Sequence, residues 1–123
     1  MGHNNEFIKY LLELLQGVGM VRVRAMFGGF GLYFHDEFEQ DGIMFALVAD
    51  DVLYLKTDEE NLPDFEQRGL EPFRYQRNGK ALSMSYSEAP GEALDDPDEM
   101  VHWARNSIDA AIRSAAKKSG KSK

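Results

Sequence analysis

The side chains that most often carry out catalysis are scarce in this sequence. Cysteine is absent, so thiolate chemistry and disulfide bonds are excluded. Histidine, the usual general base near neutral pH, occurs three times, as His3, His35 and His102. His35 precedes an acidic segment that includes Asp36 and Asp41, and a histidine among carboxylates can bind a divalent metal. A solvated turn is the commoner structure for such a composition, and we favour it.

The glycine-rich segment Gly28-Gly29-Phe30-Gly31 resembles a loop that binds phosphate. Such loops join a strand to a helix whose N-terminus meets the phosphates, whereas the residues on both sides of these glycines are patterned like strands. A tight or bulged β-turn is therefore the favoured interpretation. No serine lies in a nucleophile elbow, and the paired carboxylates fall in acidic, surface-like runs. We expect no enzymatic activity, no catalytic residue, no cofactor and no metal.

A pocket for a small anionic ligand is an alternative that the cations near this turn leave open. Arg24 and Lys56 fall in one predicted sheet, together with Tyr54. Guanidinium and ammonium groups suit the oxygens of a carboxylate or phosphate. The alternative function is thus a binder of a small anion, or an enzyme acting on one, with its pocket near residues 28–31.

Nucleic-acid binding is a further alternative. It would use the basic tail and cations of the predicted strands, which are Arg22, Arg24, Arg74, Arg77 and Lys80. The formal net charge of −7 opposes it, because an acidic body repels phosphates. The charge is uneven: residues 36–66 hold eleven acids and one base, whereas residues 105–123 hold six bases and one acid. Residues 117–123 are predicted to be a basic, flexible tail, and direct nucleic-acid binding is not expected.

Methionines and tyrosines recur in the predicted strands. They are Met26, Met44 and Met84, together with Tyr33, Tyr54, Tyr75 and Tyr86. Such residues suit an ordinary core, which the sequence favours, and they also suit adaptable binding surfaces. If one face of the sheet lacks helices, these side chains would form an exposed patch there, and such a patch usually marks an interface.

The elements that would position these residues follow from the polarity pattern. Apolar residues three and four apart predict helices over 5–16, within 58–68 and from Pro97 onward, with Trp103 beside the last apolar stripe. That stripe comprises Met100, Val101, Ala104, Ile108, Ala111, Ile112 and Ala115. Strands are predicted over 21–27, 32–34, 43–49 and 52–56. A hairpin of 73–77 and 80–86 should turn at Asn78-Gly79 and pair Arg77 with Lys80, Tyr75 with Leu82 and Phe73 with Met84.

The order α-β-β-β-β-α-β-β-α predicts a two-layer α+β fold. Antiparallel hairpins dominate it, so we expect one antiparallel sheet with its helices packed largely on one face. The length of 123 residues suits a single domain, over residues 1–116. No apolar run approaches the roughly 20 residues that span a bilayer, and no signal-peptide pattern opens the chain. We expect no membrane association and a cytoplasmic location.

The chain resembles the TfoX N-terminal domain family, related to regulators of bacterial natural competence. The most specific segment is Arg24-Ala25-Met26-Phe27-Gly28-Gly29-Phe30-Gly31-Leu32-Tyr33. The resemblance continues through Met44-Phe45-Ala46-Leu47-Val48, Leu53-Tyr54-Leu55-Lys56-Thr57-Asp58, Phe73-Arg74-Tyr75 and Met84-Ser85-Tyr86, and it covers about residues 5–115.

This resemblance implies a secretion-chaperone-like α+β fold and a homodimer, and it implies no known enzymatic activity. Together with the scarcity of catalytic side chains, it favours a protein–protein interaction module with a role in transcriptional regulation of competence-like genes. The predicted contacts to a ligand or partner are Arg24, Met26, Gly28, Gly29, Gly31, Tyr33, Tyr54, Lys56, Tyr75, Met84 and Tyr86. The identity of the protein partner does not follow from the sequence.

Overall fold

The structure is a computed structural model that describes residues 2–26, 28–37, 41–77 and 80–120. Within these ranges, the side chains of residues 2–5, 75–77, 80–84 and 118–120 lie outside the description. The described chain folds as an antiparallel sheet with helices, in the predicted order apart from two additional short elements, a 3-10 turn and one α-helix. The predicted α+β class is therefore confirmed.

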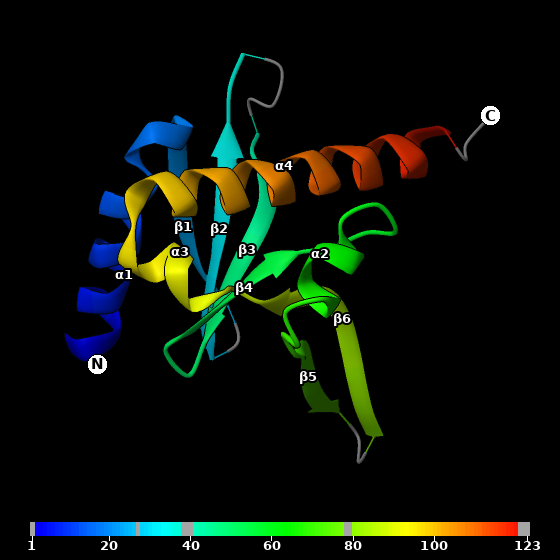
Figure 1. Ribbon diagram of the computed structural model, residues 1–123, viewed down its shortest axis with the longest axis horizontal. Helices are drawn as coiled ribbons and strands as arrows, with labels where there is room; N and C mark the ends of the chain where they lie inside the picture. Colours follow the sequence, from blue (N-terminus) through cyan, green and yellow to red (C-terminus); the bar gives the residue numbers. More distant parts are fainter. Residues whose placement is uncertain (1, 27, 38–40, 78–79, 121–123) are drawn as a thin grey trace.

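Six strands form the sheet in the order β1-β2-β3-β4-β6-β5. They are β1 (Met20–Met26), β2 (Gly29–His35), β3 (Ile43–Ala49), β4 (Val52–Lys56), β5 (Pro72–Arg77) and β6 (Lys80–Glu88). Every pairing is antiparallel. Asp50 and Asp51 both have positive φ and join β3 to β4, which is the backbone of a tight hairpin turn. The β5–β6 hairpin diverges from the other strands (Figure 1).

The helices gather on one side of the sheet (Figure 1). They are α1 (Gly2–Leu14), a 3-10 turn η1 (Gln16–Val18), α2 (Leu62–Glu66), α3 (Gly91–Asp95) and α4 (Pro97–Gly120). The α4 helix begins where Asp96 caps it, because the Asp96 carboxylate accepts a 2.9 Å hydrogen bond from the backbone N–H of Asp98. Within the described part of the chain, none of the helices is both long enough and apolar enough to span a bilayer.

The core lies between the helices and one face of the sheet. Its fully enclosed side chains include Leu11 of α1, Leu32 of β2, Phe65 of α2 and Met100 of α4. Trp103 is buried as well, with its ring edge-on to Phe65 at a centroid distance of 5.1 Å. The helix spacing that the sequence predicts therefore supplies one continuous core.

The second helix lies within the predicted range 58–68, at Leu62–Glu66, with Asn61 as its N-cap and Pro63 in its first turn. Several other details differ from the sequence-based expectation. The short helix α3 was not predicted. Ile112 was expected in the buried stripe but is 37% exposed, since α4 extends past the edge of the core there. The α4 helix also continues to Gly120, into the segment predicted as a tail, and residues 121–123 lie outside the described part.

The predicted β5–β6 hairpin is confirmed in part. Arg77 pairs with Lys80, and Tyr75 pairs with Leu82, as expected. The expected pair of Phe73 with Met84 is not formed, because the register shifts between Pro72 and Arg74. The turn residues 78–79 lie outside the described residues.

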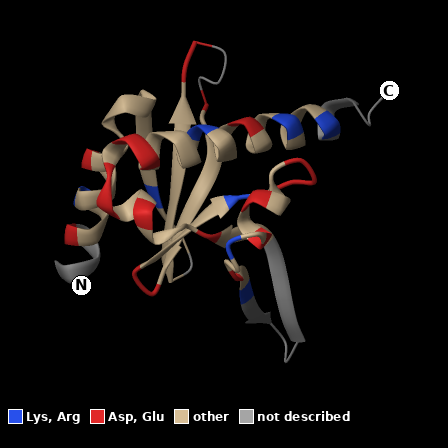
Figure 2. Ribbon diagram, viewed as in Figure 1, with Lys and Arg blue, Asp and Glu red and all other residues tan. Residues whose placement is uncertain are grey.

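Charge is segregated on the surface. Acidic residues occupy the turns and the start of α4, whereas lysine and arginine gather toward the far end of α4 (Figure 2). Among the cations considered for nucleic-acid binding, those whose side chains the structure describes do not form one patch; the side chains of Arg77 and Lys80 lie outside the described part. Arg22 and Arg24 lie on β1 and Arg74 lies on β5, which are the two opposite edges of the sheet.

Candidate functional site

The face of the sheet opposite the helices holds most of the residues predicted to contact a ligand or partner. We call it the open face, and define it by Arg22, Arg24, Met26, Gly31, Tyr33, Met44, Leu47, Tyr54, Lys56 and Tyr86. Its middle row follows from strand register, because Arg24 pairs with Gly31, Gly31 with Leu47, and Leu47 with Tyr54. Directly paired residues share a face, so this row crosses four strands on one side.

Gly31 forms the centre of the open face. A Cβ added at this position would lie 2.9 Å from the sulfur of Met26, 3.1 Å from the Tyr33 ring and 3.2 Å from the sulfur of Met44. The three side chains thus converge over a glycine and cover it. Gly31 is buried although no described helix packs above it. The result is a thin apolar layer made of adaptable methionine and aromatic side chains.

Leu47 is also buried on this face, with only 6% of its surface exposed. Phe73 of β5 helps to cover this region, since its ring meets that of Tyr54 edge-on at a centroid distance of 4.8 Å. Phe73, Leu47 and Met26 line one small apolar cavity of about 30 Å³, beside Gly29. The divergence of the β5–β6 hairpin therefore brings β5 against the open face.

Two cation–π pairs flank the apolar layer. The guanidinium carbon of Arg24 lies 5.4 Å from the centroid of the Tyr33 ring, and the Lys56 ammonium lies 5.3 Å from that of Tyr86. Gly31 stands directly across from Arg24, so no side chain blocks the diagonal contact between Arg24 and Tyr33. Lys56 also donates a 3.0 Å hydrogen bond to the hydroxyl of Ser85. Each cation is thereby held against a ring at the border of the face.

Tyr86 is the most buried tyrosine of the open face, with 7% of its surface exposed. Burial, followed by the nearby charge of Tyr33, raises its pKa to about 12. Burial also raises the pKa of Tyr54, and the carboxylates of Glu88 and Asp50 add to that effect. These phenols therefore stay neutral under ordinary conditions and act as hydrogen-bonding and apolar groups.

An alkaline titration is expected to show the burial of Tyr86 directly. In the folded protein the phenolate absorbance of one tyrosine should appear only near pH 12, and Tyr86→Phe should remove that last step. The folded pKa lies above the unfolded value of about 10, so stability from this group is complete below pH 10 and is lost as the pH rises to about 12. A final step that persists in Tyr86→Phe would contradict this assignment.

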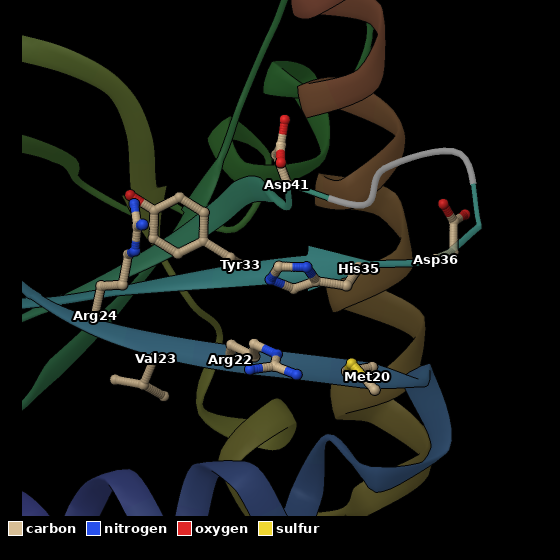
Figure 3. A pocket seen from close by; sticks show the side chains of 8 residues that line it. All are labelled: Met20, Arg22, Val23, Arg24, Tyr33, His35, Asp36 and Asp41. Carbon is tan, nitrogen blue, oxygen red and sulfur yellow. The ribbon is translucent and has the colours of Figure 1, made fainter.

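The larger cavity of the open face lies at the other end of the β1–β2 hairpin from Gly28 and Gly29. It has a volume of about 630 Å³ and is lined by Met20, Arg22, Val23, Arg24, Tyr33, His35, Asp36 and Asp41. Figure 3 shows Arg24 beside Tyr33, with His35 farther along the same strand and Arg22 on the neighbouring one. A cavity of this volume accommodates a small molecule.

The structure brings together only some of the predicted contact residues. Arg24, Met26, Gly31 and Tyr33 form one cluster on β1 and β2, whereas Tyr54, Lys56 and Tyr86 come from β4 and β6; of these three, Tyr86 lies near enough to Tyr33 to feel its charge. Three strand spacings of about 4.8 Å separate Arg24 from Tyr54, roughly 14 Å, so they do not grip one small anion. Gly29 borders the small cavity of about 30 Å³, and neither Gly28 nor Gly29 lines the larger one. Tyr75 lies on β5 and Met84 on β6, and both side chains lie outside the described part.

Arg22, His35, Leu47 and Phe73 were not among the predicted contacts. Strand alternation would have placed Arg22 beside Arg24 and His35 beside Tyr33, because residues two apart share a face. Alternation did not place Leu47 and Phe73 on this face, since their positions depend on register shifts in the β2–β3 and β5–β6 pairs. Among the residues that the structure describes, no group of three or more histidines and carboxylates could hold a metal ion.

Two comparisons with known proteins complete this description. The chain matches the model of the TfoX N-terminal domain over residues 13–111. A comparison with curated proteins gives no match. The matched segment spans β1 to β6 and most of α4, so it includes the whole open face. Since the match covers most of the sequence, the chain belongs to the TfoX N-terminal domain family.

Proposed function

We propose that the chain is a non-enzymatic protein-interaction module that works as a homodimer and binds other proteins through the open face. The observation that carries this proposal is the convergence of Met26, Tyr33 and Met44 over Gly31 on a face without described helices. Methionine, tyrosine and arginine are the residues enriched at protein interfaces, and adaptable methionines allow one surface to fit different partners.

The arrangement also matches the anatomy of a binding hot spot. Arg24 and Lys56 border the apolar layer, each held against a tyrosine ring. Rigid aromatic and arginine anchors lose little entropy on binding, and hot spots are rich in them. A role in transcriptional regulation is part of the proposal, because the TfoX N-terminal domain resembles regulators of competence. The partner of that role would bind protein to protein, since the net charge of −7 disfavours direct contact with DNA.

Met44→Lys is expected to weaken self-association at least about tenfold, or ~1.4 kcal/mol. Lysine keeps the length of the methionine side chain and reaches solvent from a half-buried site, so folding should be preserved. Sedimentation velocity at micromolar concentration is the measurement. The wild type should sediment as a dimer, and Met44→Lys should shift toward the monomer.

Ile112→Lys is the matched control. Ile112 is a partly exposed apolar residue of α4, away from the open face, and its substitution should leave the dimer intact. A wild type that stays monomeric would overturn the homodimer part of the proposal. Capture from the native host then tests the rest: a protein retained by the wild type and by Ile112→Lys, but lost with Met44→Lys, is the expected result.

A further inference from the structure

The two arginines of β1 present hydrogen-bond donors to the larger cavity of the open face. Arg22 and Arg24 are two residues apart on one strand, so their side chains leave the same face. Both are exposed, and both line the cavity of about 630 Å³. Within the described part of the chain, no carboxylate lies within ion-pair distance of either guanidinium.

A cation–π contact positions Arg24. Its guanidinium carbon lies over the Tyr33 ring, 5.4 Å from the centroid, and this contact needs none of the five N–H donors. An arginine held against a ring in this way loses less entropy when it binds an oxyanion. Tyr33 therefore acts as a positioning residue for Arg24.

Charge changes sign along the cavity. Asp36 and Asp41 belong to the lining near the β2–β3 connection, and Figure 3 shows both away from Arg24. His35 lies between the two regions on β2. A ligand with a second anionic group would place that group toward these carboxylates and be repelled. A ligand with an amine at that end would instead be attracted.

We propose that this cavity binds a small molecule by a single terminal oxyanion, a carboxylate or phosphate held by Arg22 and Arg24, with its neutral or cationic end toward Asp36 and Asp41. The site goes beyond the proposed protein-binding role and does not depend on it. It occupies the polar corner of the open face and shares Arg24 and Tyr33 with the proposed protein contact, which centres on Met26 and Met44.

Calorimetric titration with three probes of matched chain length tests this proposal. The probes are δ-aminovalerate, hexanoate and adipate, which share four methylene groups after the first carboxylate and carry an amine, a methyl group and a second carboxylate at the far end. δ-Aminovalerate should bind the full chain most tightly, and adipate should bind at least about threefold more weakly than δ-aminovalerate. Phosphoethanolamine provides the phosphate arm, and its affinity relative to δ-aminovalerate identifies which oxyanion the site prefers.

Variants assign the binding to these residues. Arg24→Gln should weaken δ-aminovalerate about tenfold, because a charge-assisted bidentate contact is lost, and Arg22→Gln should act similarly. Asp41→Asn should reduce the difference in affinity between δ-aminovalerate and adipate. Arg74→Gln, at the opposite edge of the sheet, is the control and should leave the affinity for each probe unchanged.

Three results would overturn the proposal. They are no heat of binding with δ-aminovalerate or phosphoethanolamine, unchanged binding in a folded Arg24→Gln variant, and adipate binding more tightly than δ-aminovalerate. Sedimentation of Met44→Lys remains a separate measurement, so the failure of this site and the failure of the protein-binding role are distinguishable.

Discussion

Gly29→Ala is expected to destabilise the protein by about 4 kcal/mol, which is among the larger effects of a single substitution. A Cβ at this position would lie 2.1 Å from the backbone oxygen of Val48 on the neighbouring strand. Backbone atoms cannot swing aside as a side chain can, so strands β2 and β3 would have to move apart. Chemical denaturation followed by circular dichroism measures the loss as a lower midpoint with an unchanged slope.

The neighbouring glycines are the controls for this prediction. Gly28 has a φ of 77°, and an added Cβ would meet nothing within 4 Å, so Gly28→Asn should cost only about 1 kcal/mol. Gly31→Ala meets the sulfur atoms of Met26 and Met44, which can move, and should cost less than Gly29→Ala. If Gly29→Ala and Gly28→Asn were equally stable, close approach of β3 would not explain the glycine at position 29.

The spacing of apolar residues along the sequence predicted the helices and strands of this fold, because the residues that are buried recur at that same spacing. Most apolar residues at helical spacing in α1 and α4 face the core, with Ile112 and Ala115 of the distal part of α4 exposed instead. The alternation in β1 and β2 places opposite sets of side chains on the two faces. The antiparallel order followed from short turns, which leave too little chain for crossover helices. Helix ends were less predictable: Pro63 is compatible with a start at Leu62, but the sequence does not mark the end of α2 at Glu66.

Strand register explains why the open face could be predicted only in part. The register shifts between Leu32 and Tyr33, where Leu32 pairs with Ala46 but Tyr33 pairs with Met44. The extra residue, Phe45, is fully buried in the core. Simple alternation along β3 would place Met44 and Leu47 on opposite faces, yet the bulge puts both on the open face. A sequence pattern does not mark where such a bulge falls.

The position of the larger cavity could not be predicted from the sequence for a related reason. The glycine-rich turn favoured a site at one end of the β1–β2 hairpin, but the cavity beside Gly29 there has a volume of only about 30 Å³, and the backbone of Val48 closely approaches Gly29. The cavity forms at the other end, where Met20 pairs with His35 and where Arg22 projects from the edge strand. Its depth depends on how neighbouring side chains pack, which one strand's residues do not determine.

Asp58 joins the turn after β4 to the distal part of α4. Its carboxylate accepts backbone hydrogen bonds from Glu60 at 3.0 Å and Asn61 at 3.1 Å. It also accepts two from the guanidinium of Arg113, at 2.6 and 2.9 Å. The hydrogen bond to Arg113 is the largest of the effects that lower the pKa of Asp58. One side chain thus satisfies the turn and anchors the helix.

Asp58→Ala is expected to destabilise the protein by about 2 kcal/mol, since two backbone donors lose their acceptor and the Arg113 guanidinium keeps only the longer 3.4 Å contact with Glu60. Arg113→Gln should cost less, because the turn keeps its hydrogen bonds. The free energy of unfolding, measured by urea denaturation at pH 7, gives both values.

The pH dependence separates the ion pair from other effects of substitution. The folded pKa of Asp58 lies below its unfolded value, so its contribution is complete above about pH 4 and is lost as the pH falls through the folded pKa. The stability gap between the wild type and Arg113→Gln should therefore shrink in acid. Lys117→Gln is the matched control, since the Lys117–Glu59 pair is long, at 3.9 Å, and largely exposed. A gap that is equally large at pH 7 and at pH 2 would show that Arg113 stabilises α4 by packing alone.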